Sequence, residues 1–382
     1  MKIILHIITG LSRGGAETML YKLLAHLKQN NKYRHVVLCL FGGSDFDFLS
    51  LNIPVYFGNI SRGIPSVGEI VKLRHLVSTI NPDLIHGWMY HSNLASSVLA
   101  KSEIPIIWSI HHSLHDFSNE KMLTKSIIFG CRFLSHSSSI KRIIYVSSRS
   151  MNQHEQFGFC VAKSLRIPIG FDCDIYTPNK ISRDRNRSKL HYSDEHFLIG
   201  IAARYHPVKN HIGLIKAFSR IHAKLPQARL IMAGTGMVES NIELLNVINQ
   251  NNLRSFICLL GEENDMAGFF SLLDLNVLYS NSEGFPNVLG ESMACGTLCV
   301  STNVGDAAEI IYNTGVVVPV GDINSFVSAV IGIANEDIST KRIKSKAARD
   351  RIQGSFSLSL ISQQYLSVYD SIVNSRQLIY QS

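Results

Sequence analysis

Two glutamates with seven residues between them, Glu283 and Glu291, are the clearest candidates for chemistry in this chain. An apolar turn that contains glycine and proline separates them. A buried carboxylate is costly unless it is paired or hydrogen-bonded. Two carboxylates around one turn therefore predict a site for a ligand rich in hydroxyl groups, although the spacing alone also fits solvated glutamates in a surface loop.

A helix is expected directly after this turn. Pro286 suits the first turn of a helix but blocks its interior. Asn287 can cap the helix start, which places Glu291 in the opening turns. The free backbone amides of a helix start attract phosphate. Hydroxyl-binding glutamates beside a phosphate-binding helix start are what a nucleotide sugar requires.

The stretch 283–296, EGFPNVLGESMACG, closely resembles the E-x7-E signature of retaining glycosyltransferases with the two-domain GT-B fold, in particular glycosyltransferase family 4. The resemblance implies that Glu283 holds the hydroxyls of the donor sugar and Glu291 the ribose, while amides around the turn orient the sugar. The residues of this stretch expected to bind the donor are Glu283, Phe285, Pro286, Asn287, Val288 and Glu291.

Two cations, Arg204 and Lys209, follow the apolar run LIGIAA. Arginine can form two hydrogen bonds to phosphate oxygens, and lysine supplies a point charge. They come at the carboxyl end of an expected strand, where α/β folds bind their ligands. The family has R-x4-K at this place, so the resemblance implies that both residues neutralise a leaving diphosphate. Two ordinary surface cations are the alternative.

Glycines follow strands at two further places. Gly14 and Gly15, in GLSRGGAE, would let a backbone approach a phosphate or sugar closely, although this is neither G-x-G-x-x-G nor a P-loop. The resemblance implies that this loop faces the donor across the cleft. Gly234, in MAGTG, follows another expected strand and is predicted to border the nucleotide.

Histidines end two of the expected strands in the first half. The resemblance places a histidine near the reacting sugar, and His111 is the better match; an exposed polar cap on the strand is the alternative. His86 is expected in a wall that binds the acceptor. No carboxylate spacing makes a metal site with these histidines.

The two D-x-D triplets, at 45–47 and 172–174, are short enough to arise by chance, so we expect no essential metal.

Short apolar strands alternate with amphipathic segments along the chain, which predicts parallel sheets covered on both faces. The expected strands are 3–8, 35–41, 54–57, 84–87, 106–110, 142–146, 197–203, 229–233, 257–260, 275–278, 299–302 and 315–318. The expected helices are 16–28, 69–79, 91–101, 122–135, 211–224, 237–251, 266–272, 287–294, 325–335 and 358–374. The fold class is therefore α/β, with two Rossmann-like doubly wound domains; the resemblance makes it GT-B, with a central cleft between them.

The chain is expected to consist of two domains, a linker between them and a final helix. Residues 1–175 are expected to form the acceptor-side domain, and the polar segment 176–194 a linker. Residues 195–355 are expected to form the domain that binds the nucleotide sugar. The resemblance implies that the final helix, within 356–382, packs back on the first domain.

The formal net charge is +8, and it is concentrated in residues 1–175, which hold 18 Lys+Arg against 11 Asp+Glu. A basic half suggests an anionic partner, such as a lipid surface or a lipid-linked diphosphate. No nucleic-acid module is recognised, so a nucleic-acid partner is not expected.

No apolar run reaches the ~20 residues of a membrane span. We expect a cytoplasmic protein, peripheral on the inner face of the cell membrane.

The expected function is transfer of a hexose or N-acetylhexosamine, with retention, from a nucleotide-diphosphate sugar to a glycan or polyprenyl-diphosphate-linked acceptor. A UDP-sugar is the expected co-substrate, and no other cofactor is expected. O-antigen or capsule biosynthesis is a plausible setting for such family members. Two alternatives are a nucleotide-sugar epimerase and a non-catalytic sugar-binding protein with two domains.

Overall fold

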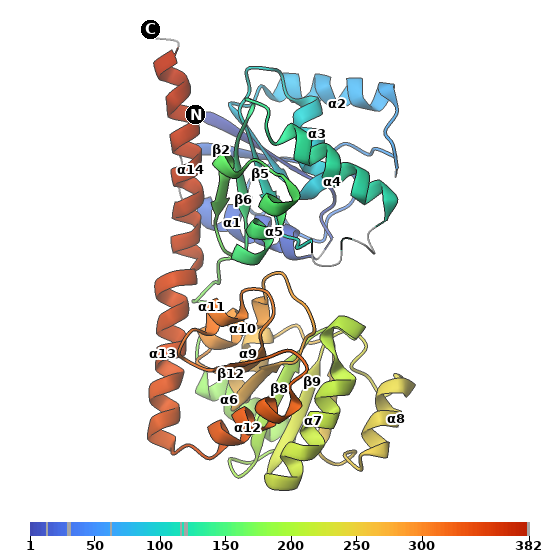
Figure 1. The fold of residues 1–382 in the computed structure, drawn as a ribbon. Coiled ribbons are helices and arrows are strands. Elements are labelled where there is room, and N and C mark those ends of the chain that lie inside the picture. Colours follow the sequence, from blue (N-terminus) through green and yellow to red (C-terminus); the bar gives the residue numbers. More distant parts are fainter. Residues whose placement is uncertain (13, 29–31, 62, 115–116, 118–120, 380–382) are drawn as a thin grey trace. The chain divides into compact units, whose positions relative to one another are not determined.

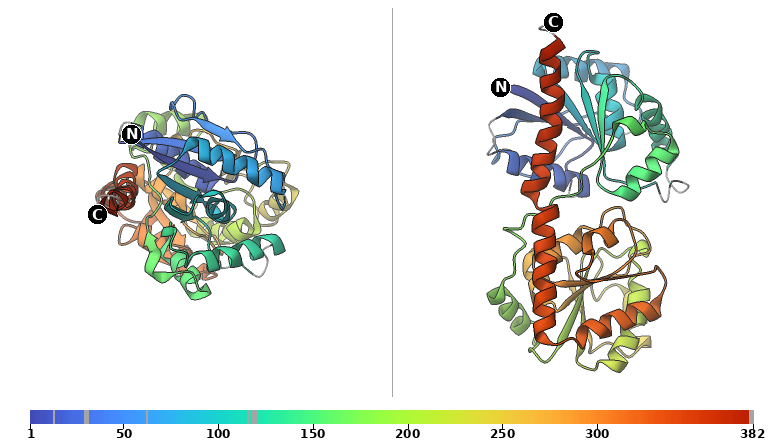
Figure 2. Two further views of the ribbon diagram at one scale, coloured as in Figure 1. Left: turned by 90° about the horizontal axis from the view of Figure 1, so that it is seen from above. Right: turned by 60° about the vertical axis from the view of Figure 1, so that its left-hand side comes forward.

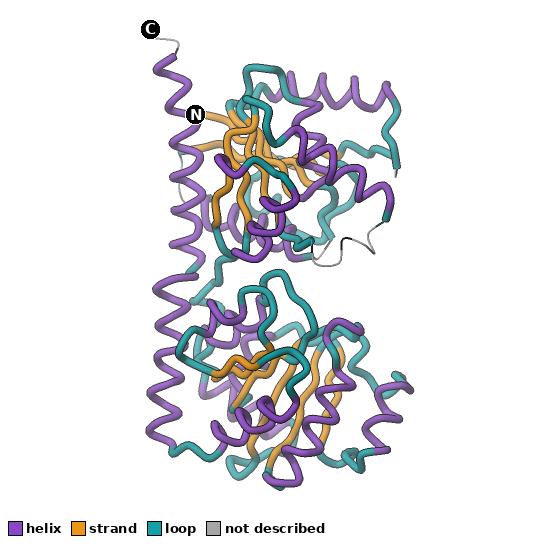
Figure 3. Tube along the Cα trace, in the orientation of Figure 1, coloured by secondary structure: helices purple, strands orange, loops and turns teal. Residues whose placement is uncertain are grey.

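The computed structural model describes residues 1–12, 14–28, 32–61, 63–114, 117 and 121–379 (Figure 1). The chain forms two compact units. The first contains Met1–Gly170 and Leu358–Ser382, and the second contains Phe171–Ser357. Each unit has one sheet of parallel strands with helices on both of its faces, as the alternation of apolar strands and helices predicts (Figure 3).

The sheet of the first unit has the strand order β3-β2-β1-β4-β5-β6-β7. Its strands are β1 (Lys2–Ile8), β2 (Tyr33–Cys39), β3 (Val55–Phe57), β4 (Leu84–Trp88), β5 (Ile106–Ile110), β6 (Ile140–Tyr145) and β7 (Ser164–Arg166). The helices between them are α1 (Gly15–Leu27), α2 (Val67–Ile80), α3 (Met89–Leu99), α4 (Met122–Leu134) and α5 (Ser148–Phe157). The strands β4 and β5 are buried along their whole length, which explains their continuous apolar runs.

The sheet of the second unit has the strand order β10-β9-β8-β11-β12-β13. Its strands are β8 (Phe197–Ala202), β9 (Ala228–Ala233), β10 (Ile257–Gly261), β11 (Leu275–Leu278), β12 (Leu298–Thr302) and β13 (Val316–Val318). Its helices are α6 (Lys180–Lys189), α7 (His211–Lys224), α8 (Ile242–Gln250), α9 (Met266–Leu272), α10 (Asn287–Ala294), α11 (Ala307–Ile311), α12 (Ile323–Ala334) and α13 (Ile338–Phe356). The order of strands reverses between β8 and β11, and doubly wound sheets bind ligands at such a reversal.

The polar segment 176–194 differs from the linker that its composition suggests. It contains α6, which packs against α9 within the second unit. Arg183 and Arg187 of α6 each form an ion pair of 2.7 Å with Asp274, just before β11. The polar residues of this segment therefore bind the sheet edge, and the chain passes between the units at 170–171 and 357–358.

The final helix, α14 (Leu358–Ile379), packs on the first unit beside α1, as predicted (Figure 2). Asp370 accepts hydrogen bonds from the Tyr33 hydroxyl and from Lys32 Nζ, the latter at 2.7 Å. Tyr369 Oη lies 2.9 Å from His86 Nδ1. None of the described helices is both long and apolar enough to cross a membrane.

A buried chain of polar rings lies under α14. His6 Nε2 is 3.0 Å from His35 Nδ1, and Trp88 Nε1 donates to His6 Nδ1 at 3.2 Å. His86 Nε2 is 2.8 Å from Ser109 Oγ. Burial lowers the pKa of all three histidines, that of His35 to about 4. The expectation that His86 lines an acceptor wall is wrong, because this side chain is fully buried between the sheet and α14.

The buried histidines predict that the free energy of unfolding falls in mild acid. Unfolded histidine binds a proton near pH 6.5, whereas folded His35 stays neutral to about pH 4. Stability is therefore complete above pH 6.5 and is lost as the pH falls below it, by about 1.4 kcal/mol per pH unit for each such group. Urea unfolding from pH 7.5 to 5 should show this slope. His35→Gln should make the slope shallower, and His75→Gln, at an exposed position, should leave it unchanged; equal slopes in all three proteins would contradict the assignment.

Candidate functional site

The loops that follow β8 and β11 are joined to each other at the carboxyl edge of the second sheet. These strands are neighbours on either side of the reversal in strand order. The Asn281 backbone amide donates to the Val208 carbonyl at 2.8 Å, and Asn210 Nδ2 donates to Asn281 Oδ1 at 3.2 Å. The structure therefore brings 204–210 and 279–286 together, where the sequence placed the diphosphate cations and the first glutamate.

Lys209 and Glu283 form an ion pair across these two loops. Lys209 Nζ lies 2.6 Å from Glu283 Oε1, and the Ser280 hydroxyl donates to the same oxygen at 2.7 Å. The side chains are only 24% and 12% exposed. A mostly buried charge pair of this kind fixes both partners, because removing either one would leave the other charge poorly solvated. The Lys209 side chain is thus paired with the Glu283 carboxylate.

Arg204 is exposed, unlike Lys209. Within the described part of the chain, its guanidinium has no hydrogen bond or ion pair. Its loop is nevertheless fixed, because the Tyr205 amide donates to the Thr235 carbonyl at 2.7 Å. The site therefore contains one cation held by a carboxylate and one available cation on a fixed backbone.

Gly234 has a structural reason to be glycine. Its φ of +132° is rarely adopted by residues with a side chain, and a Cβ atom there would collide with the carbonyl oxygen of Ala203. Gly236, two residues later, has a φ of +84°. The loop after β9 can therefore lie against the loop that carries Arg204 only because these positions lack side chains.

The start of α10 differs in detail from the prediction. Pro286 occupies the N-cap position, Asn287 is the first helical residue, and no side chain caps the helix. Asn287 is thus not the cap that was expected. Its Oδ1 atom is buried, with no hydrogen-bond partner among the described residues. The start of α10 therefore has no side-chain cap, and such a helix start presents backbone N–H groups that a ligand can bind.

Glu291 is held by a residue that the sequence did not identify. It accepts a hydrogen bond from the Tyr176 hydroxyl. The pKa of Tyr176 is raised, mainly because the side chain is buried and further because of the charge of Glu291 and this hydrogen bond. One residue earlier along the same helix, Gly290 lies so close to the Phe171 ring that a Cβ atom would collide with it. Phe171 also stacks on Phe285, with ring centroids 6.2 Å apart. No spacing in the sequence could reveal these partners, because they are more than 100 residues away.

Val288 follows Asn287 on α10 and is partly buried against an apolar cluster that includes Phe270 and Cys295. Gly305, in the loop after β12, has a φ of +52° and no room for a Cβ atom beside the Gly284 carbonyl. Both residues therefore support the backbone of the turn that carries Glu283.

The remaining predicted residues, Gly14, Gly15 and His111, belong to the first unit. Gly14 is the N-cap of α1, and a Cβ atom added at Gly15 would meet no other atom within 4 Å. Both ring nitrogens of His111 are buried without a partner among the described residues, and burial lowers its pKa to about 3. His111 is therefore a neutral imidazole at physiological pH, and neither of its ring nitrogens is exposed to solvent.

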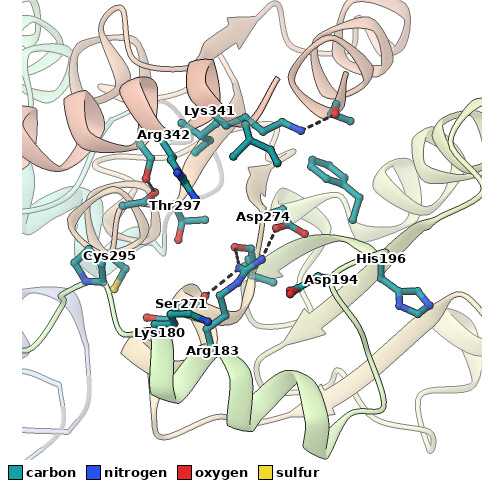
Figure 4. Close-up of a pocket in the computed structure, with 18 of the residues that line it drawn as sticks. Lys180, Arg183, Asp194, His196, Ser271, Asp274, Cys295, Thr297, Lys341 and Arg342 are labelled. Carbon is teal, nitrogen blue, oxygen red and sulfur yellow. Dashed lines mark hydrogen bonds and ion pairs between the residues drawn. The ribbon is translucent and has the colours of Figure 1, made fainter. Parts of the chain in front are cut away.

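A cavity of about 730 Å³ lies at the opposite, amino edge of the second sheet (Figure 4). Its charged groups are largely used by the fold. Arg183 donates to three successive carbonyls and to Asp274, and Lys341 Nζ donates to the Ala334 carbonyl at 2.7 Å. Arg342 is an exposed cation of its rim, as is Lys180. This cavity contains none of the predicted site residues.

The two D-x-D triplets form turns. Asp172 Oδ1 accepts from the amides of Asp174 and Ile175, at 3.0 and 3.1 Å, and Asp47 Oδ1 accepts from the Ser50 amide at 3.1 Å. Across the described ranges, no group of three or more histidine, cysteine, aspartate or glutamate side chains is arranged to hold a metal ion.

Two family models match the chain. Residues 13–175 match Glycosyltransferase Family 4, and residues 196–336 match Glycosyl transferases group 1. The EpsF protein of Bacillus subtilis is 26% identical over 326 residues, which cover 78% of each chain. The UDP-Gal:alpha-D-GlcNAc-diphosphoundecaprenol alpha-1,3-galactosyltransferase of Escherichia coli is 22% identical, over 91% of this chain and 92% of its own.

Among solved structures, Anabaena HepE in complex with UDP and glucose has the same fold, with a TM-score of 0.81. It is 21% identical, and the match covers 97% of this chain and 100% of HepE. The likeness extends over both units.

Gly234→Ala should lower the free energy of unfolding by about 1–3 kcal/mol, because it adds a strained φ and a collision with the Ala203 carbonyl. Gly332→Ala is the matched control. Gly332 lies in α12, with nothing within 4 Å of its Cβ position, so alanine should be neutral or stabilise by up to about 1 kcal/mol. Urea unfolding of both variants checks this. Equal effects at the two positions would show that Gly234 is not required by the loop contact.

Proposed function

Because the chain belongs to the family 4 (group 1) glycosyltransferases with the GT-B fold, we propose that it transfers a hexose or N-acetylhexosamine with retention of the anomeric configuration. The donor is a nucleotide-diphosphate sugar, and the acceptor is a hydroxyl of a glycan or lipid-linked saccharide. The observation that carries the proposal is the Lys209–Glu283 pair, which lies at the reversal of strand order beside the exposed Arg204.

Each group has a chemical role in donor binding. Arg204 and the uncapped start of α10 bind the diphosphate, since both offer donors to phosphate oxygens. Glu283, positioned by Lys209, accepts hydrogen bonds from the sugar hydroxyls. Glu291, positioned by Tyr176, accepts from the ribose hydroxyls.

The transfer proceeds by substitution on one face of the sugar. The bond from the anomeric carbon to the leaving diphosphate oxygen breaks, and the bond to the acceptor oxygen forms on the same face. The acceptor proton passes to the leaving phosphate. The protein orients the reactants and stabilises the charge that develops on the diphosphate, without a metal ion. Because burial lowers the pKa of His111 to about 3, no role as an acid is proposed for it.

A UDP-sugar and a polyprenyl-diphosphate-linked acceptor are the proposed substrates. UDP is bound in the HepE structure, and the name of the E. coli relative gives UDP-Gal as its donor and a diphosphoundecaprenol-linked sugar as its acceptor. The setting is assembly of an O-antigen or capsule repeat by a cytoplasmic protein at the inner face of the membrane. The excess of basic residues in 1–175 supports contact with such an anionic surface.

Transfer is favoured over the two alternatives. An epimerase would convert the donor with no acceptor present, and a binding protein would take up free sugar without nucleotide. The family match and the name of the E. coli relative both describe transferases.

Arg204→Ala should lower kcat/KM for donor consumption by on the order of 10²-fold or more, because it removes charge stabilisation of the leaving diphosphate. Arg342→Ala is the matched control, since Arg342 is also an exposed cation of the second unit but lies by the opposite edge of the sheet. Its kcat/KM should stay within about twofold of the parent protein. The assay follows release of UDP from UDP-sugars in the presence of lipid-linked acceptors, with product anomers assigned by NMR.

Normal turnover in Arg204→Ala would contradict the diphosphate role. An inverted product would refute retention, and conversion of the donor without acceptor would favour the epimerase.

A further inference from the structure

The two carboxylate oxygens of Glu283 have different surroundings. Oε1 lies 2.6 Å from Lys209 Nζ and accepts a hydrogen bond from the Ser280 hydroxyl at 2.7 Å. Oε2 has no hydrogen bond within the described part of the chain, and it is not one of the buried side-chain atoms that lack a partner. A carboxylate oxygen has about two acceptor positions. The protein therefore uses Oε1 fully and leaves Oε2 accessible.

The two groups that hold Oε1 differ in rigidity and in access. Lysine carries its charge at the end of a flexible four-carbon stem, and the Lys209 side chain is 24% exposed. Ser280 is fully buried, and its hydroxyl stands on the first side-chain carbon. An anionic ligand competes with Glu283 for the lysine ammonium, whereas no ligand group reaches a fully buried hydroxyl. Ser280 is therefore the partner that stays on Oε1 when a donor binds.

The backbone that carries the Ser280 hydroxyl is itself fixed. The Ser280 carbonyl accepts a hydrogen bond from Thr302 Oγ1 at 2.7 Å, and Thr302 is the buried last residue of β12. The next residue, Asn281, donates its amide to the Val208 carbonyl at 2.8 Å. Side chains held by such supporting hydrogen bonds keep one orientation. The Ser280 hydroxyl thus sets the rotation of the carboxylate group.

We propose that Ser280 is a positioning residue of the donor site. It holds Oε1 of Glu283, so that Oε2 alone accepts hydrogen bonds from the donor sugar. A carboxylate oxygen accepts hydrogen bonds and does not donate them, so the group that it recognises is a donor such as a hydroxyl. A site built to bind a hydroxyl rejects a substrate that lacks it, because the polar group of the site is then left unpaired. Ser280 acts only through Glu283 and does not touch the substrate.

The inference rests on the proposed function, because it names the residue that orients Glu283 within the proposed donor site. Transfer requires that a donor binds there. Discrimination between two donors that differ by one hydroxyl requires, in addition, that the recognising oxygen is fixed. The proposed function and the role of Ser280 can therefore fail separately.

The test compares the nucleotide sugar that the parent protein uses best with its monodeoxy analogues, each of which lacks one hydroxyl of the sugar. The parent should use at least one analogue with a kcat/KM that is lowered by about tenfold or more. In Ser280→Ala this ratio should fall to about threefold or less, because a carboxylate that turns freely gains less from the hydroxyl. Ser271→Ala is the matched control, since Ser271 is a buried serine at the opposite edge of the same sheet. Its ratio should equal that of the parent.

A purely structural role of Ser280 would not change this ratio, because both substrates are measured on the same folded protein. An unchanged ratio in Ser280→Ala would therefore overturn the proposal, and so would an equal loss of discrimination in Ser271→Ala. A parent protein that transfers no sugar from any donor would refute the proposed function instead.

A crystal structure of the parent protein tests the orientation without a variant and without turnover. It should contain the nucleotide sugar that raises the melting temperature most, and no acceptor. Oε1 of Glu283 should remain on Ser280, and Oε2 should lie within hydrogen-bond distance of a sugar hydroxyl. A sugar bound through Oε1, a sugar bound through both oxygens, or an Oε2 without a sugar contact would overturn the proposal.

Discussion

The ion pair between Lys209 and Glu283 is the interaction on which the candidate site depends. It joins the loops that follow β8 and β11, the two strands at which the order of the second sheet reverses. Because both side chains are mostly buried, neither charge is well solvated without the other. The pair therefore fixes a carboxylate at the carboxyl edge of the sheet and leaves Arg204 as the cation available to a ligand.

The first and last segments of the second unit pack against α10, the helix that carries Glu291. Phe171 packs on Gly290, and its backbone amide donates to the Phe356 carbonyl at 2.8 Å. Arg349 of α13 binds the carbonyl of Ala294 at the end of α10 and that of Tyr176. Residues next to the points at which the chain enters and leaves the unit are thus packed close to α10.

Sequence reasoning predicted the elements and the sheet edges well, because both follow from local patterns. Continuous apolar runs identify parallel strands, and residues after neighbouring strands meet at one edge. It failed where the partner of a side chain is distant. His86 was assigned to a surface, yet its partner Tyr369 is 283 residues away. The helix α13 was missed because it is largely polar, with only Ala348, Ile352 and Phe356 buried.

A crystal structure with a bound nucleotide would test the donor site at the carboxyl edge of the second sheet. The nucleotide should be the one, among UDP, GDP, ADP and TDP, that raises the melting temperature of the protein most. We expect diphosphate density beside Arg204 and the start of α10, with the ribose near Glu291. Density in the cavity lined by Arg183 and Lys341, at the opposite edge of the sheet, would contradict this site. So would the absence of a melting shift with every nucleotide at millimolar concentration.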